Sequence, residues 1–169
     1  MPIYTCTTAE STLTRDAKAA LAGEITRIHA DINHVPSTYV NVVFHTLPAD
    51  DVYTDGRPAE PLLVNGWVRA GHPEADTTRL ALEIAAAATR VTGIPAERVM
   101  VLFESSPAHY AVEAGRVLPQ PGEEAAWIAE SADLTEQPSA VSSEDARRGT
   151  NRSDFHRRRG LAVGRHGLQ

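Results

Sequence analysis

The residue with the clearest chemical potential is a proline, Pro2, which directly follows the first methionine. Removal of the initiator methionine, which is usual before proline, would leave a secondary amine at the start of a predicted strand. An α-amino group titrates near pH ~8, and burial or a nearby cation lowers its pKa toward neutrality. Such an amine can act as a general acid or base. Many chains begin with Met-Pro for no catalytic reason. What favours this role is that Pro2 lies at the start of the first predicted strand.

Two further candidates lie in a turn between a predicted strand and a predicted helix. Arg69 follows the apolar segment Leu62 to Val68, and His72 lies three residues later. An arginine at a strand end can bind a carboxylate through two parallel hydrogen bonds. The alternative for Arg69 is a solvated arginine that closes a strand. His72 is either a partly protonated helper or an ordinary turn residue.

The last two candidates are His29 and Glu113. His29 lies near the apolar stripe of a predicted helix, where a histidine is most often simply hydrogen-bonded at the edge of the core. Glu113 precedes Gly115 and Arg116, so it could activate water or pair with Arg116. The seven histidines show no metal-ligand spacing, and the sequence has no Gly-rich phosphate loop and no serine nucleophile elbow. We therefore expect no metal and no cofactor.

An internal repeat at an offset of 59 residues determines where these candidates lie. Residues 35–44 and 94–103 share an aliphatic residue, a proline, three variable residues, and then Val-x-Val-x-Phe. The same offset carries Pro2 onto Pro61. It also pairs apolar residues at helical spacing. These pairs are Leu21 with Leu80, Ile25 with Ile84, and Ile32 with Val91. Each copy of the repeat therefore predicts a strand, a helix and a strand.

The ends of both helices are marked in the sequence. The first is predicted to begin near Thr14, a good N-cap, and to end before Pro36. The second is predicted to begin around Pro73 and to stop at Gly93, which can adopt the left-handed conformation of a helix C-terminus.

The predicted strands at 40–46 and 99–103 are rich in β-branched residues. Two consecutive β-α-β units with right-handed crossovers form a four-stranded sheet with both helices on one face, an α/β (α+β) fold. The other face of that sheet would be bare. Because a bare apolar face would aggregate, we expect it to be buried against further copies of the chain.

The sequence predicts one domain and a tail. The predicted parts are the domain at 1–137, its repeats at about 2–47 and 61–104, a turn-rich connection at 50–61, a loop at 105–130, and the tail at 138–169. Both the connection and the loop are expected to fall outside the repeat. The tail is rich in Ser, Glu, Gln, Arg and Gly and contains a locally basic run, which is typical of a flexible extension.

Composition narrows the class of protein. A chain of 169 residues with a net charge of -6 offers no broad attraction for nucleic acid or an anionic membrane, which leaves small solutes as the expected partners. The single cysteine, Cys6, excludes an internal disulfide and suits a reducing compartment. No signal-like or membrane-spanning segment is apparent. We expect a cytoplasmic protein.

Together these residues resemble the tautomerase superfamily and, within it, the cis-3-chloroacrylic acid dehalogenase group. The resemblance covers about residues 2–130 and is most specific in the segment Glu113-Ala114-Gly115-Arg116-Val117-Leu118-Pro119-Gln120-Pro121-Gly122, which Trp127 follows. Further matches are Pro2-Ile3-Tyr4, Leu13-Thr14, Ala17-Lys18, Ile25-Thr26 with His29, and Arg69-Ala70-Gly71. The resemblance implies the doubled β-α-β architecture and a homotrimer.

The resemblance also implies roles for the candidates. Pro2 would be the catalytic amine, Arg69 the carboxylate clamp, His29 a substrate-binding partner and Glu113 the base that activates water. In the hydrolytic dehalogenation of this group, water adds to the β-carbon of a haloacrylate while the protonated proline delivers a proton to the α-carbon. Loss of halide then gives a semialdehyde.

The sequence departs from the dehalogenases at two positions. His72 stands where they have a second arginine, and Leu102 stands where they have a tyrosine. We therefore expect an enzyme of altered specificity that catalyses keto-enol tautomerisation of small unsaturated or 2-oxo carboxylic acids, with slow hydration or dehalogenation through Glu113. A genuine isomer-specific dehalogenase is one alternative. A non-catalytic trimer that presents its basic tails to an anionic partner is another.

Overall fold

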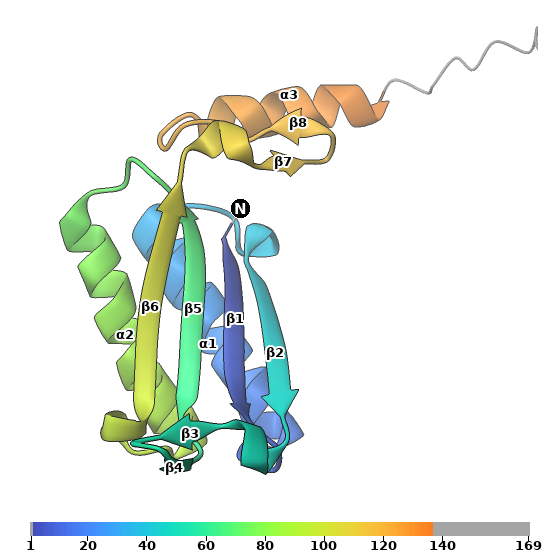
Figure 1. The fold of residues 1–169 in the computed structure, drawn as a ribbon. Helices are drawn as coiled ribbons and strands as arrows, with labels where there is room; N and C mark the ends of the chain where they lie inside the picture. The colour runs from blue at the N-terminus through green and yellow to red at the C-terminus, as the bar shows by residue number, and fades with distance from the viewer. Residues whose placement is uncertain (1, 137–169) are drawn as a thin grey trace, which may run out of the picture. The chain divides into compact units, whose positions relative to one another are not determined.

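The computed structural model describes residues 2–136, in which two helices cover one face of a four-stranded sheet (Figure 1). The strands of this sheet are β1 (Ile3–Ala9), β2 (Asn41–Leu47), β5 (Leu62–Arg69) and β6 (Val99–Ser106). The helices are α1 (Arg15–Asn33), α2 (Glu74–Thr92) and α3 (Glu124–Glu136), of which α1 and α2 pack on the sheet. The predicted fold class is confirmed.

The strand order β2-β1-β5-β6 places the two repeats side by side. β1 runs parallel to β2 and β5 runs parallel to β6, as expected when a helix connects the strands of each pair. The two repeats meet at β1 and β5, which are antiparallel and pair Tyr4 with Gly66. One repeat is therefore turned relative to the other, and the start of β1 lies at the opposite end of the sheet from the start of β5.

The helix boundaries follow the signals in the sequence. The side chain of Thr14 accepts a hydrogen bond from the backbone amide of Ala17 and caps α1. Pro73 precedes the first residue of α2, and Gly93 ends that helix with a left-handed φ of 75°. Both predicted helices are thus confirmed to within about one turn.

The core lies between the sheet and the two helices. Residues that alternate along β1 and β5 point into it, and Tyr4, Cys6 and Leu62 have no exposed surface at all. The apolar stripes of the helices meet them, and their members include Leu21 and Ile25 from α1 and Leu80 and Ile84 from α2. These helix residues are the pairs that define the repeat, so the repeat is a repeat of core positions.

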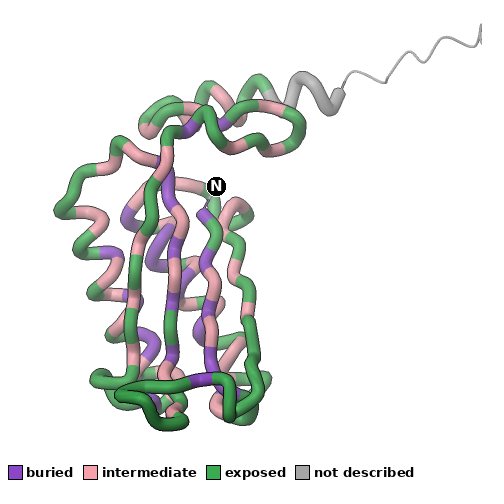
Figure 2. The backbone as a smooth tube through the Cα atoms, in the orientation of Figure 1, coloured by how far each residue is buried: buried purple, intermediate pink, exposed green. Residues whose placement is uncertain are grey.

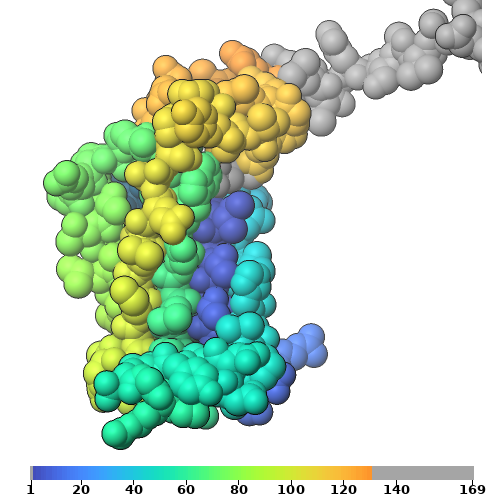
Figure 3. All heavy atoms as spheres, viewed as in Figure 1, coloured from blue at the N-terminus to red at the C-terminus, as the bar shows by residue number. Residues whose placement is uncertain are grey.

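The opposite face of the sheet carries apolar side chains with no helix over them. Figure 2 shows buried residues alternating with exposed or intermediate ones along β1 and β5, and Figure 3 shows the strand atoms at the surface. Apolar residues that are at least a third exposed on this face are Ile3, Val43, Leu47, Leu63, Met100 and Leu102. A soluble domain seldom leaves such a surface uncovered.

Two short hairpins extend the repeat beyond its predicted limits. β3 (Tyr53–Thr54) pairs with β4 (Arg57–Pro58), and β7 (Val112–Glu113) pairs with β8 (Arg116–Val117). Each hairpin follows a 3-10 turn, and every element of the second lies 59 residues after its counterpart in the first. The prediction that the connection at 50–61 and the loop at 105–130 fall outside the repeat was therefore wrong for the residues of the two hairpins.

The reason lies in the two turns. Asp55 and Gly56 in the first, and Ala114 and Gly115 in the second, all have positive φ, which is the conformation that two-residue hairpin turns require. The two turns share only the dipeptide Gly-Arg in sequence, which is too short to reveal the repeat.

Helix α3 is a second correction, because residues 124–130 were predicted to be part of a loop. The backbone amide of Trp127 donates to the carbonyl of Glu123 and closes the first turn of the helix. Arg116 then holds α3 to the second hairpin, since its guanidinium donates to the Trp127 carbonyl at 2.9 Å and lies 4.8 Å from the centre of the Trp127 ring. The predicted tail at 138–169 lies outside the described residues.

Candidate active site

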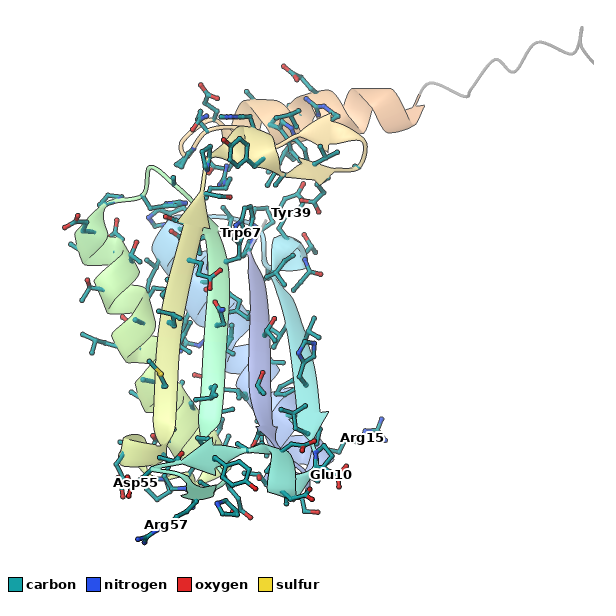
Figure 4. The ribbon with its side chains drawn as sticks, viewed as in Figure 1. Glu10, Arg15, Tyr39, Asp55, Arg57 and Trp67 are labelled. Carbon is teal, nitrogen blue, oxygen red and sulfur yellow. The ribbon has the colours of Figure 1, made fainter. Side chains whose placement is uncertain are left out.

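Four of the five candidate residues line one cavity at an end of the sheet: Pro2, His29, Arg69 and His72. Figure 4 labels Tyr39, which also lines this cavity, and Trp67 at the same end of the sheet. The volume of this cavity is about 40 Å³. A single water needs roughly 10–15 Å³ by this measure, so the cavity has room for the carboxylate and the reacting carbons of a small acid.

Pro2 is buried directly before β1. Its carbonyl accepts a hydrogen bond from the backbone amide of Asn41 at 3.2 Å, which fixes the start of the chain beside β2. Pro61 is its counterpart in the second repeat, but the nitrogen of Pro61 is acylated by Glu60 and cannot take up a proton. Only the first repeat can therefore present a prolyl amine, and only after Met1 is removed.

Arg69 is the last residue of β5, and its side chain is only 9% exposed. The alternative interpretation of Arg69 as a solvated arginine is therefore wrong. One terminal nitrogen donates to the backbone carbonyl of Pro119, and the other donates to a carboxylate oxygen of Glu124, each at 2.5 Å. The guanidinium thus lies in the cavity with two acceptors already in place.

Glu124 is a site residue that the sequence analysis missed. It is the first residue of α3, it lines the cavity, and its second carboxylate oxygen accepts the backbone amide of Gly122 at 2.7 Å. Burial alone would raise the pKa of Glu124, but hydrogen bonds from its own amide, from Arg69 and from Gly122 lower it overall. Its carboxylate is therefore ionised at neutral pH.

His29 lies on the face of α1 that packs against β1. The Tyr4 hydroxyl and the His29 Nδ1 atom share a hydrogen bond of 2.7 Å, and the two rings meet edge to face. The side chain of Asn33 donates to the His29 carbonyl and approaches Nε2 at 3.5 Å. Burial lowers the pKa of His29 to about 4, helped by the neighbouring charges of His72 and Arg69. His29 is thus a neutral side chain at pH 7.

His72 lies in the turn between β5 and α2 and is partly buried. Burial lowers its pKa, and the positive charge of Arg69 lowers it further. His72 is therefore mainly neutral at pH 7 and cannot replace the charge of a second arginine. The expectation that its presence alters specificity stays a prediction.

Glu113 and Leu102 do not line this cavity. Glu113 lies in β7, where its Oε2 atom is buried without a hydrogen-bond partner among the described residues, and burial raises its pKa. Leu102 is 48% exposed on the uncovered face of the sheet. Within a single chain, position 102 therefore lies outside this cavity.

Two searches of the described residues have negative results. No three His, Cys, Asp or Glu side chains within residues 2–130 are grouped so that they could hold a metal ion. In the same part of the chain, no helix combines the length and the apolar character that crossing a membrane requires.

Comparisons with known proteins identify the family and the fold of the chain. The family model Tautomerase_3, "Putative oxalocrotonate tautomerase enzyme", matches residues 1–132, and the chain belongs to this tautomerase family. No curated protein sequence matches the chain.

Several solved structures share the fold. N1, a member of the cis-3-chloroacrylic acid dehalogenase family, is 28% identical with a TM-score of 0.74, and the match covers 79% of this chain and 96% of N1. Native Ps01740 is 34% identical with a TM-score of 0.64, over 66% of this chain and 99% of that one. A symmetric trimer of fused 4-OT is 21% identical with a TM-score of 0.64, over 70% and 97% of the two chains.

Proposed function

We propose that this protein is an enzyme that uses the Pro2 amine as a general acid or base on small unsaturated or 2-oxo carboxylic acids. The observation that carries the proposal is that Pro2 and the buried Arg69 line the same small cavity. An amine that handles protons and a cation that binds a carboxylate are the two groups that such a reaction needs.

The favoured reaction is keto-enol tautomerisation. With the substrate carboxylate on Arg69, the neutral Pro2 amine takes the proton from the enol hydroxyl at C2. The electrons of the C2=C3 bond then take up a proton at C3 while a carbonyl forms at C2. The reaction needs no net oxidant and no second substrate, and each proton passes through a single amine.

The histidines have supporting roles in this proposal. His29 is neutral and tied to Tyr4, so it can hydrogen-bond a substrate oxygen without adding charge. His72 shapes the Arg69 side of the cavity. Both roles concern binding, which suits a reaction whose proton transfers are assigned to Pro2.

The test is steady-state ketonisation of phenylenolpyruvate by the wild type and by Pro2→Ala and Arg69→Ala. Pro2→Ala is expected to abolish turnover while the circular dichroism spectrum stays native, because it replaces the secondary amine. Arg69→Ala is expected to raise KM by at least about tenfold, the loss from one charge-assisted hydrogen bond. Equal turnover by Pro2→Ala and the wild type would remove the basis of the proposal.

We further propose that the working form is a homotrimer. The uncovered apolar face of the sheet favours self-association, and trimers occur among the structural neighbours, such as fused 4-OT. Sedimentation equilibrium is expected to give three times the chain mass. A monomer at micromolar concentration would contradict this part of the proposal.

A second activity, slow hydration or hydrolytic dehalogenation of 3-haloacrylates, is favoured by one observation. Glu113 has a buried carboxylate oxygen with no hydrogen-bond partner among the described residues, and its pKa is raised by burial. Such a carboxylate could accept a proton from a water that attacks a substrate extending beyond the cavity to β7. Halide release from each geometric isomer, lost in Glu113→Gln while ketonisation persists, would support this activity.

A further inference from the structure

The geometry points to Glu124 as a specificity-determining residue: its carboxylate occupies the Arg69 guanidinium that a substrate carboxylate would otherwise bind. This inference rests on the proposed function and concerns which acids can enter the site. An entering acid competes with Glu124 for the positive charge of Arg69. Acids that bring only one weak carboxylate contact are therefore disfavoured.

The contacts of the Arg69 guanidinium show which groups an entering acid competes with. Of its two terminal nitrogens, one binds the Pro119 carbonyl and the other binds Glu124. The side chains of Arg69 and Glu124 are only 9% and 20% exposed, so water screens this pair less than it screens a surface ion pair.

Glu124 is itself held in this position. Its Oε1 atom accepts from Arg69, and its Oε2 atom accepts the backbone amide of Gly122 at 2.7 Å. Glu124 is also the first residue of α3, where the exposed amides of a helix N-terminus favour a negative charge. The carboxylate therefore has donors on both oxygens, and an entering acid must compete with a well-bound group.

The charges in the cavity lead to the same conclusion. Arg69 and Glu124 cancel, and burial keeps His29 and His72 mainly neutral at pH 7. The other described residues that line the cavity have apolar side chains, apart from Tyr39, and Pro2 adds its amine once Met1 is removed. An acid that enters while Glu124 stays paired thus meets no net positive charge from these side chains. Removal of the Glu124 charge would leave the Arg69 cation free for a ligand.

The experiment measures binding of propionate, an unreactive small acid, by isothermal titration calorimetry at pH 7. Glu124→Gln is expected to bind propionate about tenfold tighter than the wild type, since it frees one charge-assisted hydrogen bond of Arg69. Binding of propionamide, the neutral analogue, is expected to change much less. Glu124→Ala provides a second variant that also removes the charge, and circular dichroism checks that both variants are folded.

Glu123→Gln is the matched control. Glu123 is the neighbouring carboxylate, is exposed, and accepts the backbone amide of Gln120 at 3.2 Å rather than contacting Arg69. It carries the same charge, so general electrostatic effects of losing a glutamate appear in both variants. The expected propionate affinity of Glu123→Gln is that of the wild type.

The possible outcomes separate this inference from the proposed function. Tighter propionate binding in both Glu124 variants, lost when Arg69→Ala is added, supports the inference. Unchanged or weaker binding in the Glu124 variants overturns it, even if Pro2→Ala has abolished turnover. Turnover that does not depend on Pro2 overturns the proposed function, whichever way propionate binds.

Discussion

The hydrogen bond between Tyr4 and His29 offers a sharp test of how the site is held together. Tyr4→Phe removes one hydroxyl group and keeps the ring. The ring packs edge to face against His29 and Phe103, with centroids 5.7 and 6.0 Å away, so these contacts should persist. The variant therefore isolates the 2.7 Å bond to His29 Nδ1.

The expected cost follows from the burial of both partners. Tyr4 has no exposed surface and His29 is 4% exposed, so water cannot easily replace the lost hydroxyl. Leaving a buried polar atom without a partner costs about 1–3 kcal/mol, and we expect Tyr4→Phe to lower the free energy of unfolding by this amount. Loss of the bond should also alter the tautomer balance of the His29 ring.

Urea denaturation measures the loss of stability, and ¹⁵N NMR of the imidazole nitrogens reports the tautomer. Tyr110→Phe is the matched control, because Tyr110 is 73% exposed. A double-mutant cycle with His29→Gln should give a coupling energy of about 0.5–3 kcal/mol. Equal stability of Tyr4→Phe and the wild type, with unchanged His29 nitrogen shifts, would refute the reasoning.

Two further predictions concern the same region. In the unfolded chain His29 takes up a proton near its ordinary pKa of about 6.5, whereas in the folded chain it does so only near pH 4. The free energy of unfolding should therefore fall as the pH drops from about 6.5 to about 4, by up to about 3 kcal/mol. The free energy of unfolding, measured by urea denaturation, should depend less steeply on pH in His29→Gln. An equal slope in the variant and the wild type would contradict the lowered pKa of His29. A Cβ at Gly66 would lie 2.5 Å from the Phe103 ring and 2.9 Å from the Tyr4 ring. Gly66→Ala should therefore lower the free energy of unfolding, measured in urea, by about 1–3 kcal/mol. Gly23→Ala is the control and should not destabilise, because a Cβ there meets no atom within 4 Å.

Most of the fold could be predicted because its signals are local or periodic. The cap at Thr14 and the stop at Gly93 are short-range features, and the apolar pairs at an offset of 59 residues report on core positions. The hairpins escaped prediction because their common feature is backbone conformation at turns such as Asp55-Gly56, which very different side chains can share.

The site could be predicted only in part. Pro2 and Arg69 were apparent because each lies at the end of a strand, and the sheet brings these ends together. Glu124 was missed because its partner is 55 residues away in sequence, and because Pro119, Pro121 and Gly122 before it indicate a loop. The only signal in the sequence for Glu124 was an acidic residue directly after this Pro- and Gly-rich segment, where a helix could begin.

The central claim is that a free Pro2 amine in the Arg69 cavity performs the chemistry. The most direct measurement compares phenylenolpyruvate ketonisation by the protein that begins at Pro2 with ketonisation by the same chain carrying one extra residue on the Pro2 nitrogen, with intact mass confirming each form. Acylation turns the amine into an amide that cannot take up a proton, so we predict turnover only in the first form. Equal turnover by both forms would contradict the claim.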